Sequence, residues 1–187
     1  MLLRGMVILC LGCVLSACSL ESQMLKVQPE LNFTQLNGVL VPVELVVKDN
    51  RENKSVLGYR NAKNEGEIKL KPALEAAIGK AMLAALSGQG IKTKKGPEPF
   101  TVVELSVDKL SYKTPDESWV SHIKMQAEIT LTVSRGAASF KKRFSGNRNQ
   151  DVATAPSQIF NEKYMNGLLS EIINKAMNDR EVVNFLK

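Results

Sequence analysis

The stretch that decides the fold is HIKMQAEITLTV, residues 122–133, in which polar and apolar side chains alternate without a break. The apolar set consists of Ile123, Met125, Ala127, Ile129, Leu131 and Val133. Successive side chains of a strand point to opposite faces, so this pattern predicts a strand with one buried face and one face in water. We therefore expect a sheet that is covered on one side only.

Further strands are expected on both sides of this segment. Before it, the apolar alternation of residues 103–107 continues at Leu110 in the opposite phase. A slip of one residue predicts a β-bulge near Asp108-Lys109. After it, a tight turn at Gly136 leads to residues 138–145, which alternate again and predict a third strand.

The first half of the chain is expected to add two strands and a helix. Residues 39–48 alternate as a strand, in which Pro42 cannot donate a ladder hydrogen bond and so favours an edge position or a strand start. A short strand is possible at residues 56–59. Pro72 is suited to open a helix with one apolar stripe, and Gly90 is suited to follow its end.

The last helix is expected to begin at Pro156-Ser157 and to be interrupted at Asn178-Asp179, before a short terminal piece that docks on the core. The order of elements is strand, helix, strand run, helix. This order predicts an α+β fold, with two helices packed on one face of a largely antiparallel, possibly mixed, β-sheet.

The N-terminus has the pattern of an export signal. Arg4 supplies a positive charge, and residues 6–15 form an uncharged apolar run that is shorter than the about 20 residues a permanent membrane helix needs. The run Leu15-Ser16-Ala17-Cys18 closely matches the lipobox of bacterial lipoproteins. It predicts cleavage before Cys18, diacylglycerol on the sulfur, and acylation, for example by palmitate, of the new amine. The alternative is an ordinary secretory signal with a chance cysteine.

These features predict three parts of the chain. Residues 1–17 form a signal peptide that is removed, residues 18–37 form the lipidated cysteine and a tether, and residues 38–187 form a single periplasmic domain. Extended, the tether would span at most about 65 Å. In an alternative arrangement, its apolar side chains Leu25, Val27 and Leu31 lie against the domain.

The residues offer no convergent set for catalysis. His122 is the only histidine, and the only cysteine of the mature chain is Cys18, which the lipid would consume. A Cys–His pair and a histidine-rich metal site are therefore excluded. The residue count leaves a Ser-His-Asp triad open, but nothing resembles a nucleophile elbow. We expect a protein that is not an enzyme, with no metal and no cofactor.

The formal net charge is +6, and two basic groups stand out in the sequence. The first group is Lys92, Lys94 and Lys95, and the second is Lys141, Lys142, Arg143 and Arg148. Both are candidates for contact with an anionic glycan or lipid. Alternatively, the lysines protect exposed strand edges from pairing. Nucleic acid is not an expected partner, because the signal directs export and no stacking aromatic residues accompany the charges.

Several segments, in the same order over nearly the whole mature chain, carry a family resemblance. They are the lipobox, residues 25–29, the helix leading into Gly90-Ile91, residues 107–110, the long alternating strand, residues 144–146, residues 178–181 and Phe185-Leu186. With them the chain resembles the YajG-like family of small bacterial lipoproteins. The resemblance implies an α+β lipoprotein of the outer membrane that faces the periplasm, without established catalysis. It supplies no active-site residues.

We therefore expect a lipid-anchored, non-enzymatic lipoprotein of the cell envelope. In Gram-negative lipoproteins an aspartate after the lipidated cysteine favours retention in the inner membrane, so Ser19 matches the pattern of outer-membrane sorting. Its domain is expected to bind a protein or an envelope polymer. The alternative is a small-ligand or anionic-glycan binding module, for peptidoglycan or lipopolysaccharide, that uses the basic strand around Lys141–Arg143.

Overall fold

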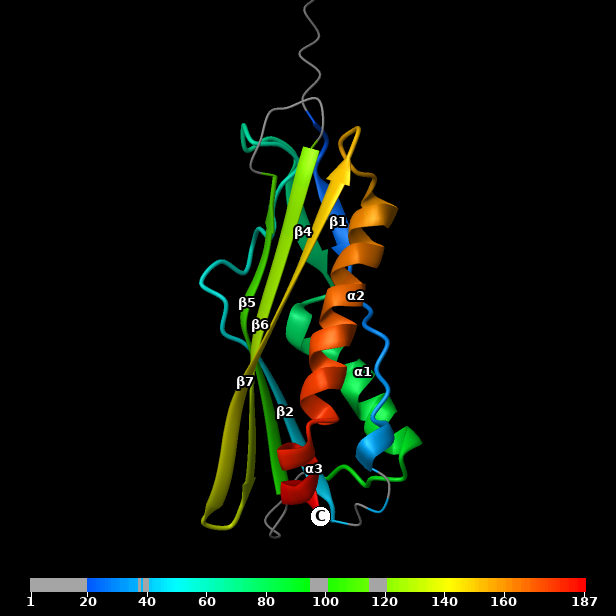
Figure 1. Cartoon of the computed structure of the whole chain (residues 1–187), viewed down its shortest axis with the longest axis vertical. Helices are drawn as coiled ribbons and strands as arrows, with labels where there is room; N and C mark the ends of the chain where they lie inside the picture. The colour runs from blue at the N-terminus through cyan, green and yellow to red at the C-terminus, as the bar shows by residue number, and fades with distance from the viewer. Residues whose placement is uncertain (1–19, 37, 39–40, 95–100, 115–120) are drawn as a thin grey trace, which may run out of the picture.

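The strand predicted at residues 122–133 lies inside a four-stranded sheet of mixed direction, in the order β2-β5-β6-β7 (Figure 1). The structure is a computed structural model that describes residues 20–36, 38, 41–94, 101–114 and 121–187. The strands of this sheet are β2 (Val43–Asp49), β5 (Thr101–Lys113), β6 (Ser121–Arg135) and β7 (Ala138–Val152). Neighbouring strands are antiparallel except β2 and β5, which are parallel.

The side chains of β6 confirm the predicted alternation, since its apolar set is buried to the last member. The predicted bulge is also present. The β5–β6 register shifts between Val107 and Lys109, so that Asp108 is the extra residue. Strand β7 runs to Val152, well beyond the predicted end at residue 145, because it stays paired with β6 along its whole length. The second half of β7 is polar on both faces, so its sequence lacks the apolar alternation that predicts a strand.

A second, three-stranded sheet was not expected from the sequence. Its order is β1-β4-β3, with β1 parallel to β4 and β3 antiparallel to it. The strands are β1 (Gln23–Lys26), β3 (Gly58–Tyr59) and β4 (Glu67–Lys71). Each is too short for a clear period-two pattern, and the pairing of β1 with β4 joins segments more than forty residues apart. The fold class is α+β as predicted, but with two mixed sheets.

Helices cover the inner face of the larger sheet (Figure 1). They are α1 (Leu74–Gly88), α2 (Gln158–Met177) and α3 (Arg180–Leu186), with a short 3-10 turn η1 (Thr34–Leu36). The predicted helix starts are close. Ser157 caps α2 by accepting a hydrogen bond from the Phe160 N–H, and the interruption at Asp179 is the cap of α3. No helix in the described part of the chain is long and apolar enough to cross a membrane.

Residues 23–36 pack on the domain, so the fold reaches further toward the N-terminus than the expected boundary at residue 38. Leu25 and Val27 are buried, as the alternative arrangement of this segment required, and so are Phe33 and Leu36. After β1 the chain stays extended to Phe33, with alternate side chains pointing inward. We call residues 26–35 the strap.

The strap is held by a polar stripe that repeats every four residues along α2. The bonds run from Lys26 N–H to Glu162 (3.0 Å), Gln28 N–H to Asn166 (2.7 Å), Glu30 N–H to Ser170 (2.8 Å), Asn32 N–H to Asn174 (2.7 Å) and Gln35 N–H to Asn178 (3.1 Å). The three asparagine amides also donate back to strap carbonyls. Four helical residues rise about 6.0 Å and two extended residues about 6.6 Å, so the two repeats match. The side chains of α2 thus supply the hydrogen bonds that a neighbouring strand would otherwise give to the strap.

One rung of this ladder gives a direct test. Asn174 accepts from the Asn32 N–H and donates to the Glu30 carbonyl, so Asn174→Ala removes both bonds. We expect a loss of about 1–2 kcal/mol in the free energy of unfolding and faster hydrogen exchange at the Asn32 amide. The control is Asn147→Ala on the exposed face of β7, where a change within about 0.5 kcal/mol is expected. Equal losses in the two variants would contradict the role given to the ladder.

Candidate functional site

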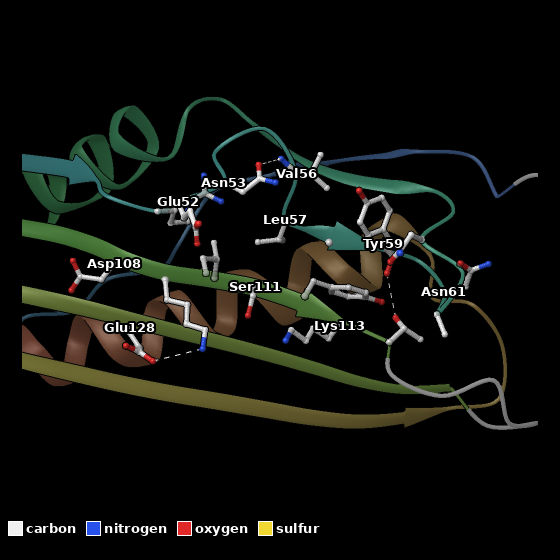
Figure 2. A pocket seen from close by; sticks show the side chains of 18 residues that line it. Glu52, Asn53, Val56, Leu57, Tyr59, Asn61, Asp108, Ser111, Lys113 and Glu128 are labelled. Carbon is white, nitrogen blue, oxygen red and sulfur yellow. Dashed lines mark hydrogen bonds and ion pairs between the residues drawn. The ribbon is translucent and has the colours of Figure 1, made fainter.

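A groove of about 790 Å³ lies between the loop after β2 and the second half of β5 (Figure 2). It exists because the loop leaves the edge of β5 and returns to it. The Asn50 N–H still donates to the Val107 carbonyl (2.9 Å), and the next main-chain contact is the Tyr112 N–H to the Leu57 carbonyl (3.0 Å). Between these points, no strand among the described residues pairs with β5 on this side. We call this space the edge groove.

The main chain of β5 faces into the edge groove at Leu110. Tyr112 directs its N–H to the groove side, and Leu110 lies two residues earlier in the same strand. Because the hydrogen-bonding groups of a strand alternate between its two edges, the N–H and C=O of Leu110 point the same way. The groove therefore presents the kind of donor and acceptor that an added extended chain uses.

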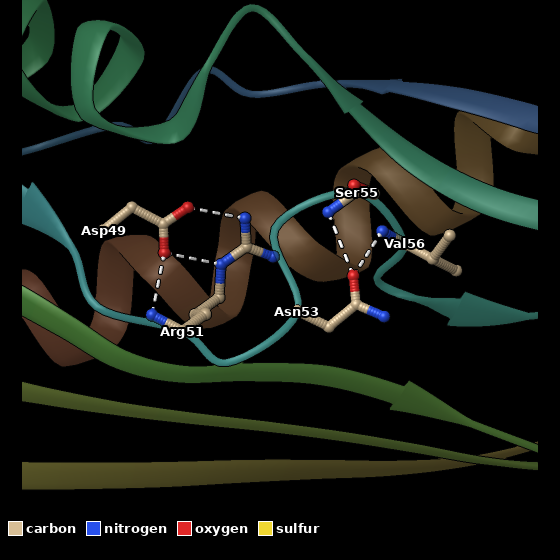
Figure 3. A network of polar contacts seen from close by, with 5 residues as sticks. All are labelled: Asp49, Arg51, Asn53, Ser55 and Val56. Atoms are coloured by element: carbon tan, nitrogen blue, oxygen red, sulfur yellow. Dashed lines mark hydrogen bonds and ion pairs between the residues drawn. The ribbon is translucent and has the colours of Figure 1, made fainter.

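Asparagine side chains order the outer wall of the edge groove. Asn53 Oδ1 accepts from the Ser55 and Val56 N–H groups, both at 3.0 Å (Figure 3). Asn61 accepts in the same way from two N–H groups of its own turn. Such turns fix the loop backbone without any help from a sheet. The wall is therefore shaped before any ligand arrives.

A buried ion pair holds the base of this loop (Figure 3). Arg51 Nε and Nη2 lie 2.8 and 2.7 Å from the two carboxylate oxygens of Asp49, and the Arg51 N–H donates to the same carboxylate at 3.1 Å. The two side chains are only 5% and 3% exposed. Burial alone would raise the pKa of Asp49, but the hydrogen bonds and charge of Arg51 outweigh it, and the pKa lies below its ordinary value.

Charged and hydroxyl groups line the mouth of the edge groove on the solvent side of the sheet. Lys109 Nζ lies 3.9 Å from Glu128, and Asp108, directed outward at the bulge, accepts from the Thr130 hydroxyl at 2.5 Å. The Ser111 hydroxyl and Arg51 Nη1 are buried and have no hydrogen-bond partner among the described residues. The groove mouth therefore offers both hydrogen-bond donors and hydrogen-bond acceptors to the polar groups of a ligand.

Two of the basic residues predicted for anionic contact instead join β7 to the helices. Lys142 Nζ lies 3.0 Å from Asp179 and 2.5 Å from Glu181, and these hydrogen bonds raise the pKa of Lys142. Arg148 lies 3.1 Å from Glu171 and also stacks over the Tyr164 ring. Both charges therefore have partners within the domain.

The other predicted site residues are spread over the molecule. Lys141 and Arg143 are exposed on β7, and Lys92 and Lys94 are exposed after α1, away from the edge groove. His122 pairs with Asp151 at 2.7 Å on the exposed side of the larger sheet. Lys95, the start of the strand predicted at residues 39–48, and the lipobox Leu15-Ser16-Ala17-Cys18 lie outside the described residues.

The groove residues themselves were not singled out from the sequence. Two sequence signals fall on them: the phase change at Asp108, which marks the inner wall, and the possible short strand at residues 56–59, of which Gly58–Tyr59 is β3. Within the described residues, no group of three or more His, Cys, Asp or Glu side chains is placed to hold a metal ion.

From residue 29 to its end, the chain is similar to a known protein family. A family model described as "Uncharacterized lipoprotein" matches residues 29–187. The chain belongs to this lipoprotein family. The YajG-like resemblance predicted from the sequence is thereby confirmed. Membership places the lipoprotein at a membrane of the cell envelope. A search of curated proteins found no match.

One of the solved structures compared with this chain shares its fold. A Xanthomonas campestris protein of the DUF330 family has a TM-score of 0.63 at 8% identity, over 87% of this chain and 97% of that chain. At this identity the likeness is one of fold alone. A minor lipoprotein from Acinetobacter baumannii has a TM-score of 0.39 at 11% identity, over 79% of this chain and 92% of that chain.

Proposed function

We propose that this lipoprotein is a non-enzymatic binding protein of the outer membrane, anchored by lipid on Cys18, whose periplasmic domain binds an extended segment of a partner protein in the edge groove. The observation that carries the proposal is the uncovered edge of β5 at Leu110, beside a preformed loop wall. An extended peptide satisfies such an edge with its own main chain, and side chains at the groove mouth select its sequence.

The charges around the groove support binding rather than catalysis. The Asp49 carboxylate is fully engaged by Arg51, and Lys109 lies opposite Glu128. A nucleophile needs an adjacent base within hydrogen-bond reach, and the groove hydroxyl of Ser111 has no such neighbour among the described residues. What the groove offers is hydrogen bonding and complementary charge.

The lipobox and Ser19 support the location. Cleavage before Cys18 and acylation of its sulfur and amine would give several acyl chains, which hold a protein stably to a membrane, whereas one chain is marginal. Ser19 in place of aspartate supports sorting to the outer membrane, and the domain would then face the periplasm.

Crosslinking in living cells tests the proposed groove. A photoreactive amino acid at Lys109, at the groove mouth, is expected to give an adduct of defined mass, whereas the same group at exposed Lys80 on α1 gives none. Ala62→Trp, which fills the groove from the loop, is expected to abolish the adduct. The matched Ala84→Trp on the surface of α1 is expected to leave it unchanged.

A second candidate function rests on Lys141 and Arg143, which are exposed on β7 beside Thr130 and Thr132 of β6. These residues suit an anionic glycan, peptidoglycan or lipopolysaccharide. A photoreactive group at Lys141 separates the two candidates, since capture of glycan at Lys141 without an adduct at Lys109 would replace the groove proposal. Absence of any adduct at Lys109 under several growth conditions would refute the groove proposal.

A further inference from the structure

The first described residues leave almost no free tether before the fold begins. Leu20 already lies against the turn at Gly66, where a φ of +65° suits glycine and an added Cβ would come within 3.0 Å of the Leu20 Cβ. The Glu21 carbonyl accepts from Arg60 Nη1 at 2.9 Å. Two residue steps separate Leu20 from Cys18, or about 7 Å when extended. A lipid on Cys18 would hold this end of the domain at the membrane surface.

Exposed apolar side chains gather close to this end. In the described part of the chain the exposed large apolar residues are Met24 (46%), Leu83 (43%) and Ile159 (78%). Ile159 lies at the turn of α2 that borders β1, because the side chain of the preceding residue, Gln158, donates to the Met24 carbonyl at 2.9 Å. Figure 1 shows β1 beside the upper turns of α2, close to the first described residue, Leu20. Leu83 lies apart from them on α1.

Lysines surround this apolar pair. The parallel register sets Met24 beside Lys69 and Lys26 beside Lys71, on the outer face of the smaller sheet. Lys163 is exposed one turn after Ile159 on α2. The nearby acids are Glu67, which pairs with Lys69 at 2.6 Å, and Glu162, which accepts from the Lys26 N–H. With Glu21, which is exposed three residues before Met24, four lysines stand against three glutamates, and the surface keeps a small positive excess.

We propose that this surface, formed by Met24, Lys26, Lys69, Lys71, Ile159 and Lys163 and here called the anchor flank, lies on the bilayer that holds the Cys18 lipid. The inference rests on the proposed lipid anchor. Apolar side chains set among lysines enter the headgroup region and attract anionic phospholipids. Since Met24 follows Leu20 by four residues, it lies within about 14 Å of it, and the short connection keeps the anchor flank near the headgroups.

Site-specific labelling tests the anchor flank on the full lipidated protein. Cys18 is the only cysteine left once residues 1–17 are removed, so one added cysteine takes a fluorophore uniquely. The labelled positions are Met24→Cys, Ile159→Cys and, as the matched exposed control, Leu83→Cys. In vesicles of equal parts phosphatidylethanolamine and phosphatidylglycerol with nitroxide-labelled lipid, we expect several-fold stronger quenching at positions 24 and 159 than at 83.

Charge reversal gives a second readout. Lys163→Glu, at an exposed position, is expected to reduce the quenching at Met24→Cys several-fold, and Lys80→Glu on α1 to leave it unchanged. Equal quenching at all three labelled positions would overturn the anchor flank. Protection of positions 24 and 159 from solvent in detergent would also overturn it, because a second copy or a protein partner would then cover them. Intact mass measures acylation of Cys18 separately. An acylated protein without selective quenching refutes the anchor flank alone, and an unacylated one refutes the proposed anchor.

Discussion

Replacing Phe33 by alanine is expected to lower the free energy of unfolding by about 3–5 kcal/mol. Phe33 lies in the strap, in a segment whose sequence is typical of a tether, yet its side chain is 0% exposed and belongs to the same core cluster as β6 and α2. Removing the ring would leave a cavity that the surrounding side chains fill only in part. Urea unfolding followed by circular dichroism measures the loss.

The control for this variant is Leu83→Ala on α1. Leu83 is a large apolar side chain as well, but it is 43% exposed, so we expect a change below about 1 kcal/mol. If Phe33→Ala costs no more than Leu83→Ala, the strap does not stabilise the domain. The ladder of α2 would then hold the strap in place without contributing to the core.

Replacing Asp49 by asparagine is expected to cost about 3–5 kcal/mol at pH 7, because it leaves the Arg51 guanidinium buried without its counter-charge. Asparagine keeps the size of the side chain, so the loss reports the charge. The double variant Asp49→Asn/Arg51→Met removes both charges and is expected to recover much of the stability. A double variant no more stable than Asp49→Asn would show that packing at the base of the loop, and not the charge, sets the loss.

The effect of Asp49 also has a predictable pH dependence. Its pKa is lower in the folded protein than the about 3.9 of an unfolded chain, so on acidification the unfolded state takes up the proton first. The stability that the pair contributes is complete above about pH 4 and is lost as the pH falls through the folded pKa. The gap between the wild type and Asp49→Asn should therefore narrow below about pH 4. A gap that stays constant there would contradict the pairing.

The larger sheet was predictable because its information is local. In β6 the alternation of apolar and polar residues indicates which face is buried, and the change of phase before Leu110 in β5 indicates the bulge. The smaller sheet is different. Its strands β1 and β4 are four and five residues long, and their pairing depends on a contact between distant segments that neither sequence reveals. Short strands of this kind become visible only in the folded chain.

The apolar residues of the strap suggested that it could pack on the domain, but its hydrogen-bonding partner was hidden for another reason. The stripe from Glu162 to Asn178 repeats every four residues, but a polar stripe on a helix ordinarily faces water. Only the match between helix rise and strand rise makes it a partner for an extended chain. Likewise, the charge pattern of β7 identified Lys142 and Arg148 without showing that Asp179 and Glu171 lie opposite them.

The ladder between the strap and α2 bears on how the domain withstands mechanical load. The strap runs parallel to α2, since Lys26 meets Glu162 and Gln35 meets Asn178. A pull on the N-terminus along this direction loads the hydrogen bonds between the strap and α2 in shear. All of these bonds then resist together, instead of breaking one after another. With the proposed lipid on Cys18, helix α2 would fasten the domain to its anchor along this direction.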